Sequence, residues 1–345
     1  MKKIIAITLL ILFLVAAFAG WKLFGPTLSA SHGNFIYIRT GENLQGLKDS
    51  LISNNQIKND WWFDRASSII GFKASGVKAG KYRITNGMSL FNLVRMLKNG
   101  RQTPVNLVIT KLRTKEDFAK KAGAMFECDS LQIINFLNNQ DSLRQYGLDS
   151  NTVMSTVIPD TYTYFWNTTA QKIFQKLYDN SQKFWSEDRR KKAADHGLSP
   201  VQAYTLASII EEETNAKTDK PNIASVYLNR MNKGMPLQAD PTIKFALKDF
   251  GIKRIYEKYL LTESPFNTYR NKGLPPGPIC TPSRETLEEV LNSPHTDYLY
   301  FVADAEHPGR HLFTTNYKDH MIYARQYHLL LNKSDSLIKV KQTPE

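Results

Sequence analysis

Cysteine is scarce in this sequence, and the patterns that mark metal and nucleic-acid sites are missing. The only cysteines among 345 residues are Cys128 and Cys280, and a single pair does not show whether a disulfide forms. No HExxH-type pattern occurs, and His307 and His311 flank a Pro-Gly turn instead of sharing a helix face. The formal net charge is +13, but no dense Lys/Arg block is interleaved with aromatic residues that could stack on bases. We therefore expect no metal, no cofactor and no nucleic-acid partner.

One long hydrophobic run is present, at the N-terminus. Lys2 and Lys3 precede an uncharged apolar run from Ile4 to Gly20, and Trp21 and Lys22 follow it. The length fits a short transmembrane helix, and the flanking lysines predict a cytoplasmic N-terminus with the rest of the chain outside the membrane. A cleaved signal peptide is the alternative, because Ala17-Phe18-Ala19 is an acceptable cleavage site. Export makes anionic lipid headgroups or an anionic wall polymer the natural partners of a basic surface.

The hydrophobic fraction of 42% and the length allow about two domains after this segment. We predict a cytoplasmic tip and transmembrane anchor at 1–25, a polar tether to about residue 33, and a small α+β module at 34–105. The module contains a short repeat in which a strand, a Gly turn and an amphipathic helix follow one another. Its copies are Ile38-Arg39-Thr40-Gly41 with Leu44, Leu47 and Leu51, and Ile84-Thr85-Asn86-Gly87 with Leu90, Leu93 and Leu97.

The strand–turn–helix pattern of 34–105 resembles a LysM-like module. This class is associated with binding the glycan of peptidoglycan. A module that serves only as a spacer is an equally good interpretation of the same residues.

A larger, mostly helical α+β domain is expected at 106–335. A strand at 105–109 leads into it, and Thr114 with Asp117 is expected to cap a helix. A long polar helix is predicted from 170 to 196, a hairpin from 298–302 and 311–315, and a last helix from Asn316 to about Leu331. The overall fold class is therefore α+β with an N-terminal transmembrane helix.

The helix that ends at Glu213 is the best-marked element of this domain. Ser199 is its predicted N-cap, Pro200 takes the first helical position, and Gln202 completes a capping box. At about 100° per residue, Glu213 lies within roughly 20° of Leu206 on the apolar face. Glu212 points away from that face and is expected to be solvated. Burial raises the pKa of a carboxyl group, which suits Glu213 to act as a general acid, although closing the helix with a basic partner is the simpler alternative.

Polar residues that follow this helix are candidates for ligand binding. Asp240 is predicted to cap a helix with Pro241 at its first position, and Gln238 and Asp240 could line a groove. Two further stretches, 264–270 and 273–278, form a stiff non-helical segment rich in Pro, Asn, Thr and Tyr. Ordered loops of this composition commonly hold extended polymers.

Together these motifs resemble the YceG-like family of membrane-bound endolytic murein transglycosylases. The motifs, in order, are Ala-Ser-Ile-Ile-Glu-x-Glu-Thr at 207–214, Leu-Gln-x-Asp-Pro-Thr at 237–242, Asn-Thr-Tyr at 267–269, Gly-Leu-Pro-Pro-Gly-Pro at 273–278 and Tyr-Leu-Tyr-Phe-Val-Ala-Asp at 298–304. The resemblance covers nearly the whole chain. This sequence departs from the family at minor positions, such as Glu212, where lysine is common.

The resemblance implies that Glu213 is the catalytic acid. It would protonate the glycosidic oxygen between N-acetylmuramic acid and N-acetylglucosamine and then accept the proton of the muramyl C6 hydroxyl, leaving a 1,6-anhydro end. The intramolecular nucleophile makes a second carboxylate unnecessary. The residues expected to bind the sugar are Glu211, Gln238, Asp240, Thr242, Asn267, Thr268 and Tyr269.

The expected partners are peptidoglycan glycan strands, the inner (cytoplasmic) membrane and, by family resemblance, peptidoglycan synthases. Two alternatives to the transglycosylase remain open. One is a muramidase that uses water as the nucleophile, and the other is a non-catalytic glycan-binding scaffold of the wall-synthesis machinery.

Overall fold

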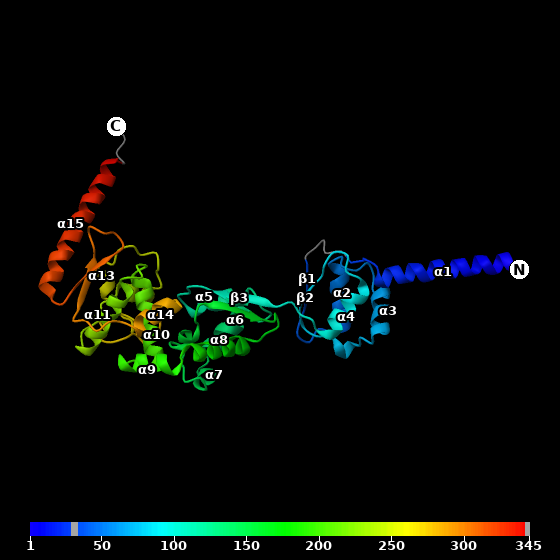
Figure 1. Ribbon diagram of the computed structural model, residues 1–345, viewed down its shortest axis with the longest axis horizontal. Coiled ribbons are helices and arrows are strands. Elements are labelled where there is room, and N and C mark those ends of the chain that lie inside the picture. Colours follow the sequence, from blue (N-terminus) through cyan, green and yellow to red (C-terminus); the bar gives the residue numbers. More distant parts are fainter. Residues whose placement is uncertain (29–33, 342–345) are drawn as a thin grey trace. The chain divides into compact units, whose positions relative to one another are not determined.

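The computed structural model describes residues 1–28 and 34–341, which form two compact units (Figure 1). The first unit comprises 1–107, 122–129 and 163–170, and the second comprises the remaining segments from 108 onward. The sequence placed 122–129 and 163–170 in the catalytic domain, whereas their contacts in the structure group them with the first unit. Helices and short two-stranded sheets occur in the described chain, as the mixed α+β class requires.

Helix α1 (Lys2–Phe24) is long and apolar enough to cross a membrane. Its C-terminal end is packed against the first unit, because Leu23 and Leu28 are buried in the core there. The backbone N–H of Leu28 also donates to the carbonyl of Met88 at 3.2 Å. The predicted tether is therefore wrong for residues 25–28, which are fixed by burial and hydrogen bonding. Its remainder, 29–33, lies outside the described residues.

The module after α1 contains the predicted repeat. Its elements are β1 (Phe35–Ile38), α2 (Leu44–Ser53), α3 (Trp61–Ile70), the 3₁₀ turn η1 (Ala74–Gly76), β2 (Gly80–Arg83) and α4 (Leu90–Asn99). Strands β1 and β2 pair antiparallel with Phe35 opposite Arg83. Each strand is followed by a glycine of positive φ, 84° at Gly41 and 77° at Gly87, before its helix begins.

Apolar residues of both copies meet in the core of the module. Leu47 and Leu51 of α2 and Leu93 and Leu97 of α4 are almost fully buried. Ser89 caps α4 by accepting a hydrogen bond from the Asn92 N–H. The helical periodicity of the leucines thus accounts for how α2 and α4 pack.

Strands β3 (Val105–Ile109) and β4 (Asp160–Tyr164) form a second two-stranded sheet. The elements of the intervening and following chain are α5 (Lys115–Gly123), α6 (Ser130–Asn138), α7 (Gln140–Arg144), η2 (Val153–Thr156), α8 (Ala170–Phe184) and α9 (Glu187–Asp195). The predicted single helix over 170–196 is wrong. It breaks where Trp185 is buried and Ser186 caps the new helix α9.

The C-terminal part of the second unit is built around α10 (Pro200–Glu213). The other elements are α11 (Lys220–Asn232), α12 (Asp240–Leu247), α13 (Glu257–Leu260), α14 (Arg284–Leu291), the antiparallel hairpin β5 (Tyr300–Ala303) and β6 (His311–Thr314), and α15 (Tyr317–Lys341). Helix α10 contacts α9, α11, α12 and α14. This central place explains why eight consecutive residues of α10, 203–210, are buried.

Two further observations complete the second unit. Helix α15 continues to Lys341, beyond the predicted end near Leu331, because no Gly or Pro follows Leu331 until Pro344.

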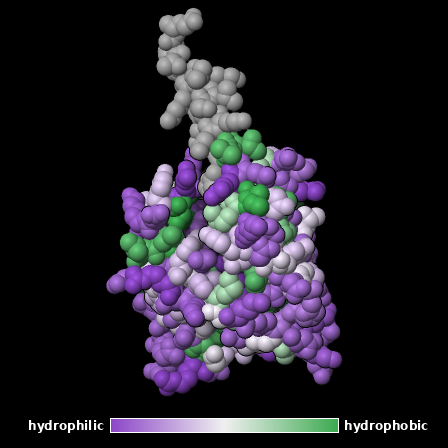
Figure 2. Space-filling view, turned by 90° about the vertical axis from the view of Figure 1, so that its left-hand side faces the viewer, coloured by the Kyte–Doolittle hydropathy of each residue, from purple (hydrophilic) through white to green (hydrophobic). Residues whose placement is uncertain are grey.

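The face shown in Figure 2 is mostly hydrophilic, with apolar residues in small separate patches. Such a distribution is typical of a surface exposed to water.

Candidate active site

Glu213 is the last residue of α10, and the helix places it as the sequence predicts. Leu206, Ile209 and Ile210 of α10 are fully buried in the core of the second unit. The capping box of Ser199 and Gln202 fixes the start of the helix, since both of its hydrogen bonds are present. As a whole residue, Glu213 is neither fully buried nor fully exposed.

The surroundings of Glu213 favour its protonated form. Burial, followed by the negative charge of Asp240, raises the pKa of Glu213 from 4.5 to about 7. The hydroxyl of Tyr227 on α11 donates to Glu213 Oε2 at 3.4 Å and, with the positive charges of Lys244 and Arg230, limits this rise. A carboxyl group with such a pKa exists in both protonation states at neutral pH. A group that first donates a proton and then accepts one needs access to both states.

Asp240 lies at the start of α12, but it does not cap the helix. The N-cap is Ala239, and the Asp240 side chain makes no capping hydrogen bond. Instead, Asp240 Oδ1 accepts a hydrogen bond of 2.5 Å from the Tyr269 hydroxyl. Burial and this hydrogen bond raise the pKa of Tyr269. The predicted capping role is therefore wrong, and the exposed carboxylate of Asp240 is directed to the site instead.

The backbone next to Asp240 is held in an unusual conformation. Gln238 has a positive φ of 56°, which is uncommon for a residue with a side chain. Arg230 on α11 stabilises this segment by donating to the Leu237 carbonyl at 2.7 Å, and its Nη1 lies 3.4 Å from Gln238 Oε1. Because Gln238 is exposed, its amide remains accessible to a ligand.

Three residues expected to bind sugar are buried instead. Thr242, Asn267 and Thr268 are at most 1% exposed. The Thr242 and Thr268 hydroxyls lie 2.9 Å apart, and Thr268 Oγ1 also accepts from the Ala239 N–H at 3.0 Å. Asn267 donates to two carbonyls, of Leu260 and Thr262, and accepts from the Tyr269 N–H. In this structure these side chains hold the loop of Tyr269 against α12 and offer no surface to a ligand.

Glu211 is also engaged within the protein. Its Oε2 accepts hydrogen bonds from Lys220 at 3.0 Å, from Ser283 at 3.1 Å and from Thr286. Burial raises the pKa of Glu211, but these hydrogen bonds and the charge of Lys220 outweigh burial and lower it. Glu211 therefore links α10 to α11 and α14 as a carboxylate, through partners different from those of Glu213.

Glu212 is not solvated, contrary to the sequence-based expectation. Its side chain is 14% exposed and forms ion pairs with Lys111 at 2.9 Å and Arg113 at 3.1 Å. Both cations follow strand β3. These ion pairs attach the segment 108–121 to the C-terminal end of α10, where Glu212 lies.

Sequence reasoning missed the role of Tyr227 and the contribution of Lys244. The three-residue spacing of Tyr227 and Arg230 could have indicated that both face one site. The contact between Tyr227 and Glu213 joins two helices, so only the tertiary structure reveals it. Within the described chain no cluster of three potential metal ligands occurs, and His311 pairs with Asp219.

Comparisons with known proteins agree with one another. Residues 36–326 match the sequence profile of the YceG-like family. A Bacillus subtilis protein named endolytic murein transglycosylase is 30% identical over 300 residues, covering 83% of this chain and 82% of the relative. A Streptococcus pneumoniae protein of the same name is 26% identical over 322 residues, covering 82% of this chain and 56% of the relative. The crystal structure of a YceG-like protein from Listeria monocytogenes aligns with a TM-score of 0.56 at 26% identity, covering 83% of this chain and 97% of that chain.

Proposed function

Because this chain belongs to the YceG-like family, we propose that it is an endolytic murein transglycosylase, a lytic enzyme that cuts within peptidoglycan glycan strands. The bond cleaved joins N-acetylmuramic acid to N-acetylglucosamine. The observation that carries the proposal is the carboxyl group of Glu213, whose pKa is raised to about 7 beside Asp240 and Tyr227.

Glu213 acts first as the acid and then as the base. The protonated carboxyl group gives its proton to the glycosidic oxygen as the bond from that oxygen to muramyl C1 breaks. The C6 hydroxyl oxygen of the same sugar attacks C1, and its proton passes to the Glu213 carboxylate. One bond is broken, one is formed, and Glu213 returns to its starting state.

The surrounding residues position the substrate and tune the acid. Tyr227 and the positive charges of Arg230 and Lys244 stabilise the carboxylate that forms during the reaction. Asp240, Tyr269 and Gln238 present accessible polar groups to sugar hydroxyl and N-acetyl groups. Thr242, Asn267, Thr268 and Glu211 act indirectly by holding these elements in place.

The N-terminal parts bring the enzyme to its substrate. Helix α1 is a retained anchor in the cytoplasmic membrane, and the contact of Phe18, which lies before the predicted cleavage site, with Trp62 supports its retention. The two lysines before the apolar run favour a cytoplasmic N-terminus and a catalytic domain outside. The module at 34–105 is LysM-like and binds glycan. The anchored enzyme works on nascent strands beside peptidoglycan synthases.

A water-using muramidase is the second candidate, and Asp240 is the observation that favours it. A hydrolase commonly uses two carboxyl groups, and Asp240 supplies a second one close enough to raise the pKa of Glu213. The two reactions differ in their products. The transglycosylase leaves 1,6-anhydro ends, whereas the muramidase adds water and leaves reducing ends.

Mass spectrometry of the products distinguishes these candidates. We expect purified glycan strands incubated with the protein to give internal fragments with anhydromuramyl ends. Reducing muramyl ends would establish the muramidase. Binding of strands without cleavage would leave a glycan-binding scaffold as the function.

A further inference from the structure

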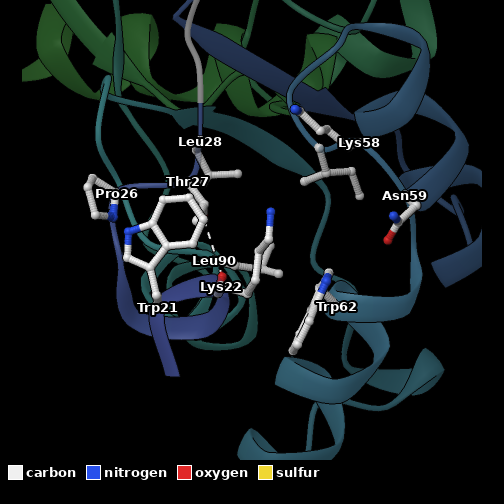
Figure 3. A pocket seen from close by; sticks show the side chains of 10 residues that line it. Trp21, Lys22, Pro26, Thr27, Leu28, Lys58, Asn59, Trp62 and Leu90 are labelled. Carbon is white, nitrogen blue, oxygen red and sulfur yellow. Dashed lines mark hydrogen bonds between the residues drawn. The ribbon is translucent and has the colours of Figure 1, made fainter. Parts of the chain in front are cut away.

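We propose that the first unit binds the headgroup of an anionic phospholipid in a pocket at the C-terminal end of α1. The pocket has a volume of about 220 Å³ and is lined by residues from α1, from the segment that follows it, from 57–59, and from the starts of α3 and α4 (Figure 3). The lining residues used here are Trp21, Lys22, Lys58, Asn59, Trp62 and Leu90. The inference rests on α1 as a membrane span and is independent of the catalytic role of Glu213.

The position of the pocket is fixed by the way α1 joins the module. Phe18 of α1 contacts Trp62 of α3, with ring centroids 6.2 Å apart, and Phe24 contacts Phe91 of α4 at 4.9 Å. Leu23 is buried in the same core. The pocket therefore lies where the apolar helix ends, which is the level of the lipid headgroups when α1 crosses a bilayer.

The charges of the pocket suit a phosphate group. Lys22 and Lys58 both line it, and none of its lining residues is acidic. Among the described residues no carboxylate lies within 4.0 Å of either ammonium group, although the neighbouring Lys48 is paired with Asp60 and Asp64. Two uncompensated cations in one pocket attract an anion, and the Asn59 amide can donate a further hydrogen bond.

The aromatic residues indicate a lipid and not a free anion. Figure 3 shows the rings of Trp21 and Trp62 on opposite sides of the opening, with Lys22 between them. The Lys22 ammonium lies 5.0 Å from the Trp21 ring centroid. Indole rings favour the boundary between acyl chains and headgroups, so the pair provides an apolar border for a phosphate held by the lysines.

Lipid binding to the full-length protein tests the inference. The protein in detergent is titrated with phosphatidylglycerol or phosphatidylcholine, and bound lipid is counted by native mass spectrometry. We expect preferential binding of phosphatidylglycerol, weakened about tenfold or more in the variant Lys22→Gln/Lys58→Gln. The control Lys73→Gln/Arg101→Gln removes the same charge from exposed positions of the same module and should change binding less than about twofold.

Three results would overturn the inference. Equal losses in both double variants would show that only the diffuse charge of the module attracts the lipid. Equal binding of the two lipids would show that the pocket does not recognise the anion. Displacement of the lipid by excess inorganic phosphate would assign the pocket to a free anion. Should the double variant fail to fold, Lys58→Glu alters an exposed residue and is expected to give the same loss.

Discussion

At Glu213, the neighbours of one carboxyl group act on it in opposite directions, and on this we base the proposal that it takes both proton-transfer roles. Burial and Asp240 favour the neutral acid, whereas Tyr227, Lys244 and Arg230 favour the carboxylate. The balance places its pKa at about 7. A catalyst that donates and then recovers one proton is most effective when its pKa is close to the working pH.

The pH dependence of cleavage should follow from this balance. Because the acid form starts the reaction, we expect kcat/KM to fall as the pH rises through about 7. Asp240→Asn removes a negative charge that raises the pKa of Glu213, so the fall should move to lower pH. The exposed control Asp297→Asn should leave the profile in place. A shift of the decrease in kcat/KM to higher pH in Asp240→Asn would contradict this electrostatic account.

The same pKa shift predicts an effect on stability that does not depend on activity. The folded protein holds the Glu213 proton between pH 4.5 and about 7, so wild-type stability decreases as the pH rises through this range. Glu213→Gln should therefore increase the free energy of unfolding by on the order of 1–3 kcal/mol at pH 8 and leave it unchanged at pH 4.

Urea denaturation at both pH values measures this difference. Glu212→Gln is the matched control, because it weakens the ion pairs with Lys111 and Arg113 and should reduce stability at pH 8 by about 1 kcal/mol. A loss of stability in Glu213→Gln at pH 8 would contradict this expectation, because it would mean that the folded protein stabilises the Glu213 carboxylate.

Helical periodicity was sufficient to predict the inward position of Glu213, because one turn of α10 relates it to buried residues. It could not predict the ion pairs of Glu212, whose partners lie 99 or more residues away along the chain. The burial of Asn267 and Thr268 was missed for a similar reason. Asn and Thr bind ligands and also satisfy loop carbonyls, and only the tertiary contacts distinguish the two uses.

At the scale of elements, α10 is held by the two residues that directly follow the proline-rich segment at 273–278. The Ile279 N–H donates to Ser208 Oγ of α10 at 3.0 Å, and the Cys280 thiol contacts the Ser208 carbonyl at 3.3 Å. The prolines fix the path of the segment, so these contacts are made with little loss of conformational entropy. The segment therefore stabilises the helix that carries Glu213.

Gly277 should be intolerant of any side chain. A Cβ atom at this position would lie 2.0 Å from the backbone carbonyl oxygen of Asn151, which cannot move without shifting its segment. We expect Gly277→Ala to lower the free energy of unfolding by about 1–3 kcal/mol in thermal or urea denaturation. Gly251→Ala, where only the Asp249 carboxylate is near, should cost less than about 0.5 kcal/mol. Equal stability of the two variants would contradict the close packing at Asn151.

Elements with local signals were predicted well, and those that depend on burial were not. Capping residues and glycine turns revealed α4, α10 and the β5–β6 hairpin. The division of α8 from α9 was missed, because the burial of Trp185 is a tertiary property. The predicted cap at Asp240 failed since its carboxylate accepts from Tyr269 instead.

At the scale of the whole molecule, the C-terminal half of the apolar α1 packs on the module that follows it. Removing it at the predicted cleavage site, after Ala19, would take away Phe18, which contacts Trp62. We therefore expect the protein extracted from membranes to keep its N-terminal segment and to show the full 39.4 kDa mass. Intact-mass measurement checks this, and a shorter species starting at Gly20 would show that the segment is a signal peptide.

The central claim is that Glu213 alone supplies the acid and base of the reaction. The most direct measurement is the rate at which anhydromuramyl ends form on glycan strands, followed by mass spectrometry for wild type, Glu213→Gln and Glu212→Gln. The account predicts anhydro ends from wild type, a loss of about 10³-fold in Glu213→Gln, and a rate within about tenfold of wild type in Glu212→Gln. Formation of anhydro ends by Glu213→Gln at a rate close to that of wild type would contradict the account.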